Sequence, residues 1–185
     1  MRGILASAAI LLVVTGVASC SGEGGDDPGK TPPRQAEEAP PPDRDRPADV
    51  SHVVLKSPDG ETKKIADYSG RILMVHFFTT WHEDTGRLVE WMNGIQRKFG
   101  KNVDVLGLAM DREGRSAVKS FLARNDVRFE VFYNGEEAAP GFGGVRTLPT
   151  TYILLRDGTI LHRYNGLQRN KVYEDFILGM YRRKL

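Results

Sequence analysis

Residues 71–85 read RILMVHFFTTWHEDT, and this stretch decides the fold. Its first eight residues are apolar apart from an arginine at the start and one histidine, which predicts a strand buried on both faces of a sheet. Downstream, apolar residues recur at helical spacing and stop before Gly100: Leu88, Trp91, Ile95 and Phe99. This spacing predicts an amphipathic helix that ends at the glycine. A buried strand, a short polar loop and a helix together indicate an α/β unit.

The rest of the domain alternates between strands and helices. Ahead of residue 71, a strand from His52 to Lys56, a turn at residues 58–60 and a strand through Ile65 indicate a β-hairpin. Further strands are expected at residues 103–110, 129–133, 150–155 and 159–164, and further helices around residues 118–122 and 172–180. This order, which ends in a hairpin and a helix, predicts a three-layer α/β domain with one core.

Composition excludes several classes of protein. Hydrophobic residues make up 40% of the chain and charged residues 27%, which excludes a collagen, a coiled coil and a polytopic membrane protein. The formal net charge is only +2, without a clustered basic stripe, so no nucleic-acid partner is expected. The one cysteine, Cys20, excludes an intramolecular disulfide, a CxxC redox pair and a multi-cysteine zinc site.

The first 19 residues have the features of a bacterial lipoprotein signal peptide. Arg2 precedes an apolar run from Ile4 to Val17, and small residues lead to Cys20, so the segment resembles a lipobox. The resemblance implies cleavage before Cys20 and acylation of that residue, and several acyl chains anchor a protein stably. An ordinary secretory signal that ends at a cysteine by chance is the alternative. The apolar run is too short to span a bilayer comfortably.

A tether rich in proline, glycine and acidic residues follows. Residues 21–50 hold seven of the ten prolines, eight Asp/Glu and four Lys/Arg. Because they include almost no large apolar residue, they cannot bury a core. A partly polyproline chain of this length reaches roughly 90 Å. We therefore expect three parts: a signal peptide at residues 1–19, a lipidated Cys20 with a disordered tether at 20–50, and a globular domain at 51–185.

Two motifs, in this order, resemble segments of the TlpA/ResA-type thioredoxin-like (redoxin) proteins. Residues 77–85, FFTTWHEDT, lie at the end of the buried strand and resemble the family's FWATWCPPC segment. Residues 144–152, GVRTLPTTY, are followed by Arg156-Asp157-Gly158 and resemble its G-V-x-x-x-P-T-T-F…D-x-D-G segment. Together with the elements around the motifs, the resemblance covers residues 51–183.

The resemblance implies an α/β, thioredoxin-like fold with a central mixed β-sheet flanked by helices and an N-terminal β-hairpin extension. It also implies a cis peptide bond between Leu148 and Pro149, which would shape the surface beside residues 82–85. The family further implies location in the bacterial cell envelope, with the lipid-anchored domain facing the periplasm.

The sequence departs from the family at the two catalytic cysteines. Aligned on Trp81, these positions hold His82 and Thr85. Thiol-disulfide exchange needs one thiolate to attack and a second thiol to resolve the mixed disulfide, and neither an imidazole nor a hydroxyl can do this. The acylated sulfur of Cys20 would be an unreactive thioether. Although the family is one of thiol-disulfide oxidoreductases, we expect no dithiol activity and assign no catalytic residue.

Three interpretations of the residues at the cysteine positions stay open. In the structural one, Glu83 and Asp84 lie near the positive end of the helix, where Asp84 or Thr85 caps free amides. In the second, His76 and His82 bind zinc or copper with Asp84, because imidazole and carboxylate suit these ions. The third makes His82 a general base and Thr85 a nucleophile, and it has the least support.

His76 occupies the place where thioredoxins carry a buried aspartate and TlpA-type proteins often an asparagine. Because side chains alternate along a strand, His76 is expected on the same face as Met74 and Phe78. A lone interior histidine is more often a hydrogen-bonded core residue than a metal ligand. This interpretation is preferred, and no cofactor is expected.

The surface beside the proline favours a binding function. Thioredoxin-fold proteins present the backbone next to the cis-proline to extended peptides, and this surface does not depend on the cysteines. The expected binding residues are Trp81, His82, Glu83, Asp84, Thr85, Leu148, Pro149 and Thr150. We expect an extracytoplasmic peptide or protein partner, bound in a non-redox or chaperone-like role, and membrane attachment through Cys20.

Overall fold

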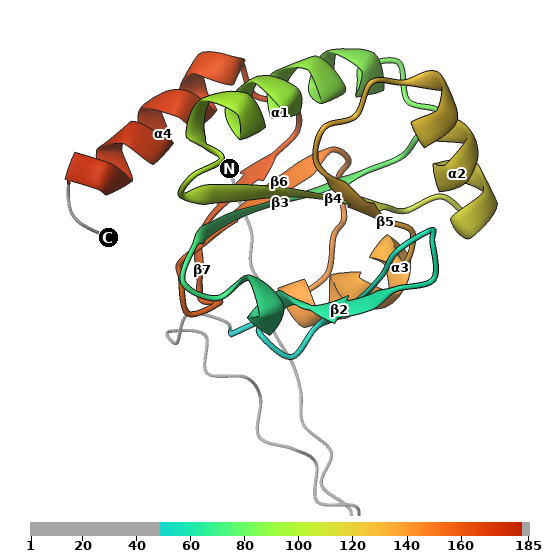
Figure 1. Cartoon of the computed structure of the whole chain (residues 1–185), viewed down its shortest axis with the longest axis horizontal. Helices are drawn as coiled ribbons and strands as arrows, with labels where there is room; N and C mark the ends of the chain where they lie inside the picture. The colour runs from blue at the N-terminus through green and yellow to red at the C-terminus, as the bar shows by residue number, and fades with distance from the viewer. Residues whose placement is uncertain (1–48, 183–185) are drawn as a thin grey trace, which may run out of the picture. The chain divides into compact units, whose positions relative to one another are not determined.

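The structure, a computed structural model, describes residues 49–182 of the chain (Figure 1). The predicted signal peptide, Cys20 and nearly all of the predicted tether lie outside these residues. No helix between residues 49 and 182 has the length and apolar character needed to cross a bilayer.

Strands and helices alternate along the described residues largely as the sequence predicts. In chain order the elements are β1 (Val54–Lys56), β2 (Thr62–Lys64), the 3-10 helix η1 (Ile65–Tyr68), β3 (Ile72–Phe78), α1 (Thr85–Phe99), β4 (Val103–Ala109), α2 (Arg115–Arg124), β5 (Glu130–Phe132), α3 (Gly135–Ala138), the 3-10 helix η2 (Ala139–Phe142), β6 (Thr150–Leu154), β7 (Ile160–Asn165) and α4 (Asn170–Arg182).

A five-stranded mixed sheet forms the centre of the domain. Its strand order is β5-β4-β3-β6-β7, and β1 pairs with β2 in a separate two-stranded sheet. Strand β3 is parallel to β4 and antiparallel to β6, with His76 opposite Gly107 on one side and Thr151 on the other. Helices α1 and α4 cover one face, and β2 and α3 lie across the other (Figure 1). The predicted thioredoxin-like architecture with its N-terminal hairpin is confirmed.

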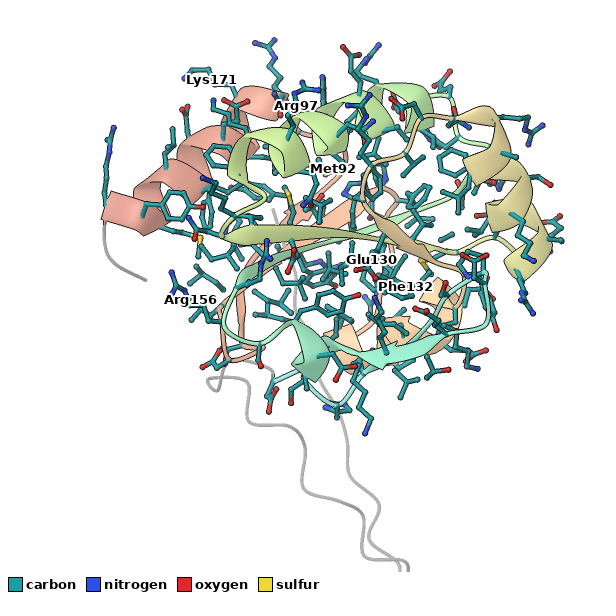
Figure 2. All side chains as sticks on the ribbon, viewed as in Figure 1. Met92, Arg97, Glu130, Phe132, Arg156 and Lys171 are labelled. Carbon is teal, nitrogen blue, oxygen red and sulfur yellow. The ribbon has the colours of Figure 1, made fainter. Side chains whose placement is uncertain are left out.

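Strand β3 is apolar throughout because both faces of the sheet are covered. All seven of its residues are buried. Met74 and Phe78 belong to the hydrophobic cluster shared with α1, α2 and α4, whereas Phe77 belongs to the cluster on the hairpin side. Figure 2 shows Met92 of α1 on the first side of the sheet and Phe132 of β5 on the other. Both clusters are built from residues 49–182, so this part of the chain carries its own core.

The folded part begins slightly earlier than residue 51. Asp49 forms an isolated β-bridge with Thr159, and Val50 is fully buried. The two residues that the sequence assigns to the end of the tether therefore belong to the fold.

Some local details differ from the sequence-based expectation. The helix expected around residues 172–180 buries Tyr173, Ile177 and Met180, whereas its apolar residue Val172 is 38% exposed. Short helices form at residues 135–142, between the expected strands at 129–133 and 150–155, where no helix was predicted. Helix α1 ends before Gly100 as predicted, but that glycine has an ordinary φ of −59°. Glycine is needed there because a Cβ would collide with the carbonyl oxygen of Gln96.

Candidate functional site

The loop between β3 and α1 is held by a carboxylate that the sequence analysis missed. The backbone N–H of Thr80 donates to both carboxylate oxygens of Asp111 (3.1 Å each), and its hydroxyl donates to one of them (2.7 Å). Asp111 is only 5% exposed and follows β4. Because β3 and β4 are parallel neighbours, the segments that follow them meet at one edge of the sheet. The position of Asp111 after a buried strand was the signal that could have identified it.

The side chains at the start of α1 do not cap the helix, which corrects the expectation for Asp84 and Thr85. Asp84 occupies the N-cap position without a side-chain capping bond. Its dihedrals (φ −80°, ψ −6°) are helical, whereas a capping residue is normally extended. The buried hydroxyl of Thr85 donates to the carbonyl of Thr79 at 2.8 Å. Because that proton is directed to a backbone oxygen, the geometry gives no support to Thr85 as a nucleophile.

His82 makes a local contact with the backbone of the loop. The Asp84 N–H donates to His82 Nδ1 at 3.2 Å, and the Asp84 carboxylate lies 3.9 Å from the same nitrogen. Accepting this hydrogen bond assigns the proton of a neutral ring to Nε2. About a third of the His82 side chain is exposed, so its free edge faces the surface.

His76 lies inside the domain, on the face that the strand alternation predicts, with its ring 6.3 Å from that of Phe78. Its Nδ1 is 2.6 Å from the Thr151 hydroxyl, which is 3.1 Å from the Tyr173 hydroxyl. The Gln168 N–H donates to that same tyrosine oxygen at 3.3 Å. His76 Nε2 is buried without a partner among the described residues. Burial lowers the pKa of His76 to about 3, so the ring is neutral.

The structure does not arrange His76, His82 and Asp84 as a set of metal ligands. Between residues 49 and 182, no group of three or more His, Cys, Asp or Glu side chains is placed to hold a metal ion. His76 is 1% exposed and bonded to Thr151, whereas His82 lies at the surface. This geometry favours the interpretation of His76 as a hydrogen-bonded core residue.

A narrow hollow separates the start of α1 from the loop before β6. The Leu148–Pro149 bond is cis, as the resemblance implies. The hollow is lined by Phe78, Thr79, His82, Asp84, Thr85, Leu88, Leu148 and Pro149. Its free space of about 10 Å³ is about what one water needs. The Thr79 hydroxyl is buried and has no partner in the described part of the chain.

The predicted binding residues fall into two groups. His82, Asp84, Thr85, Leu148 and Pro149 line this hollow. The other three are not part of its wall: Trp81 is 74% exposed, Glu83 is exposed, and Thr150 is fully buried in β6.

The backbone of Leu148 is free beside this hollow. The Pro149 carbonyl accepts the Gly166 N–H at 2.7 Å, and from Thr150 onward the chain pairs with β3 and β7. Within residues 49–182, no hydrogen bond uses the N–H or C=O of Leu148. A strand-like segment of another chain can therefore pair with these two groups.

The central sheet is followed by a helix that starts beyond its middle strand, and the cis-proline loop faces the start of that helix. This arrangement defines a thioredoxin-like protein, here of the TlpA/ResA type. The AhpC/TSA family matches residues 48–163. The chain belongs to this family.

Relatives with the same fold include proteins of thiol-disulfide chemistry. The chain is 26% identical to the thiol-disulfide oxidoreductase ResA of Bacillus thuringiensis over 131 residues, which cover 70% of this chain and 75% of ResA. A thiol:disulfide interchange protein of Chlorobium tepidum has a TM-score of 0.62 at 19% identity, covering 71% of this chain and 94% of that one. The exposed lipoprotein thioredoxin of Streptococcus pneumoniae has a TM-score of 0.58 at 17% identity, covering 68% and 97%.

Proposed function

We propose that this chain is a cell-envelope protein that binds an extended peptide segment of a partner protein and carries out no dithiol exchange. The observation that carries the proposal is the unpaired backbone of Leu148, which lies beside the hollow at the start of α1. The exposed Trp81 belongs to the loop that leads into this helix. An extended peptide would pair with Leu148 through its main chain and gain apolar contact with Trp81.

The side chains at the cysteine positions support binding without redox chemistry. His82 accepts a backbone hydrogen bond, and Thr85 is buried and donates to Thr79. The only cysteine of the chain is Cys20, and a single thiol cannot both attack and resolve a mixed disulfide. This combination supports a non-redox or chaperone-like role.

Envelope location and lipid anchoring are further parts of the proposal. They rest on the lipobox-like segment that ends at Cys20 and on the kind of relatives that share the fold. One of these, from Streptococcus pneumoniae, is an exposed lipoprotein thioredoxin. Anchoring through Cys20 would hold the domain outside the cytoplasm, where it would meet extracytoplasmic protein segments.

Binding of an unfolded chain without thiols tests the peptide-binding role. Residues 21–185, which include the whole core, would be titrated into fluorescently labelled, reduced and carboxymethylated α-lactalbumin, and anisotropy would be recorded. We expect saturable binding that Trp81→Ala weakens about ten-fold, because buried tryptophans contribute strongly at interfaces. The matched control is Leu178→Ala, which removes another exposed apolar side chain from α4.

A second measurement tests the main-chain pairing. In the NMR spectrum of the same protein, the amide resonance of Leu148 should shift on titration, while amides in α4 should not. Equal weakening by Trp81→Ala and Leu178→Ala, or an unperturbed Leu148 amide at saturation, would overturn the proposed binding surface.

A further inference from the structure

Helices α1 and α4 end next to each other, far from the candidate site. The rings of Phe99 and Tyr181 lie 6.2 Å apart at this point. Four cations lie at or next to these two helix ends, and we call them the basic end: Arg97, Lys98, Lys101 and Arg182. The first three, with Tyr181, line an open hollow of about 520 Å³, which has room for a phosphate group. Helix α1 starts at the candidate site and has 15 residues, so the basic end is about 22 Å away.

The basic end carries more positive charge than its neighbours neutralise. Lys98 pairs with Glu174 at 2.5 Å. The other three cations, Arg97, Lys101 and Arg182, are exposed and form no ion pair with any residue from 49 to 182. Cations near the ends of two helices complement both dipoles, which explains why the fold tolerates them together. Figure 2 shows Arg97 on the outer side of the helical layer, and the sequence continues with Arg183 and Lys184.

The chain enters the domain at the same end of the sheet. Asp49 forms its bridge with Thr159 in the turn between β6 and β7. The Arg156 carbonyl of that turn accepts the Gly70 N–H at 2.8 Å. The next residue, Arg71, donates from its guanidinium to the carbonyl of Gly100, just beyond α1. The 48 residues that precede Asp49, with the apolar segment and Cys20, therefore connect at the end where the free cations lie.

We propose that the basic end is a docking surface for an anionic phospholipid bilayer. Each Lys or Arg near such a surface is attracted by its negative potential, within a Debye length of about 8–10 Å. Docking there keeps the candidate site on the far side of the domain, free to meet a partner. The inference goes beyond peptide binding, and it rests on the envelope location but not on the acyl anchor.

Vesicle sedimentation without the lipid anchor tests this surface. Residues 21–185 would be mixed with vesicles of phosphatidylcholine alone or with 30% phosphatidylglycerol. We expect preference for the anionic vesicles, with loss of binding when salt is raised to about 500 mM. The double variant Arg97→Gln with Lys101→Gln should weaken anionic partitioning about 25-fold, on the basis of about five-fold per cation. The matched control is Arg112→Gln with Lys119→Gln, which removes two exposed cations elsewhere and should change partitioning less than three-fold.

Three results would overturn the proposal. One is equal sedimentation of the unmodified protein with both kinds of vesicle. Another is the same loss in both double variants, which would show attraction by net charge without a preferred face. The third is displacement from vesicles by soluble polyglutamate at low concentration, which would favour an acidic protein partner. Circular dichroism of each variant would show that the fold is kept, and peptide binding measured on the same samples would report separately on the candidate site.

Discussion

His76 is a residue whose titration is strongly altered by the fold. It is a titratable group in the middle of the central strand, bonded through Nδ1 to Thr151, and its ring lies 6.3 Å from that of Phe78. Removal from water lowers its pKa from an ordinary 6.5 to about 3. A neutral ring is compatible with the single hydrogen bond to Thr151, because a buried imidazolium would need a second partner for Nε2.

The depressed pKa predicts a specific loss of stability in acid. Above pH 6.5 His76 is neutral in both folded and unfolded chains and has no effect. Below pH 6.5 the unfolded chain binds a proton that the folded chain does not, until about pH 3 is reached. The free energy of unfolding should therefore fall by about 1.4 kcal/mol per pH unit from this group.

His76→Asn should remove that contribution to the pH dependence. Urea unfolding at several pH values between 6.5 and 4 would measure it. The free energy of unfolding should change less steeply with pH than in the unmodified protein, by up to about 1.4 kcal/mol per pH unit, which corresponds to one bound proton. At pH 7 we expect a change in stability of about 1 to 3 kcal/mol, from the altered hydrogen bond to Thr151. His52→Asn, which replaces an exposed imidazole, is the control. Identical slopes for His76→Asn and the unmodified protein would contradict the assigned pKa.

At the scale of elements, the start of α1 has the backbone turn expected for a CxxC motif but lacks both cysteines. The helix begins at Thr85 beyond the end of β3, and the proline loop lies across the hollow from it. Positions 82 and 85 are one helical turn apart, and the Thr85 N–H donates to the His82 carbonyl at 3.0 Å. The backbone is therefore arranged as a CxxC turn would require.

Restoring the two thiols tests this alignment. His82→Cys with Thr85→Cys should produce a pair that oxidises to a disulfide, and the thiol at position 82 should have a depressed pKa because it lies near the helix N-terminus. Thiol titration before and after mild oxidation would measure both effects. The single variant His82→Cys and the unmodified domain should show no insulin reduction above background. A folded double variant that stays reduced under oxidising conditions would show that the alignment on Trp81 is wrong.

At the scale of the whole molecule, the chain combines a folded domain with a long N-terminal segment. The acidic and proline-rich residues 21–48 separate Cys20 from the domain, and the chain enters the domain at the end opposite the candidate site. With an anchor at Cys20, that placement would keep the peptide-binding surface directed away from the membrane.

Acylation of Cys20 is a prediction of the lipobox-like sequence. Cys20→Ser should abolish incorporation of a radioactive fatty acid and leave an uncleaved or soluble protein, because the thiol is the acceptor of the lipid. Ser19→Ala, which keeps a small residue before the cysteine, should still be labelled. Unchanged labelling of Cys20→Ser would refute the anchor and leave an ordinary secretory signal as the alternative.

The sequence by itself determined the fold class, the burial of β3, the face on which His76 lies and the absence of a dithiol. These follow from local periodicity and from residue counts, which need no knowledge of distant contacts. The motif residues at positions 82–85 and 148–150 also mark the two segments that meet at the hollow, but only through resemblance to a family. The expected caps on α1 were wrong because a side chain's partner depends on the backbone dihedrals that the complete loop adopts.

Only the tertiary structure decided which polar groups are paired. Asp111 holds the loop of Thr80 across 31 residues, and His76 meets Thr151 across 75. The free backbone of Leu148 and the basic end formed by α1 and α4 are likewise consequences of packing between distant segments. Hydrogen bonds and charge clusters of this kind depend on distances that the sheet and its helices set. These distances cannot be predicted from the local pattern of residues along the chain.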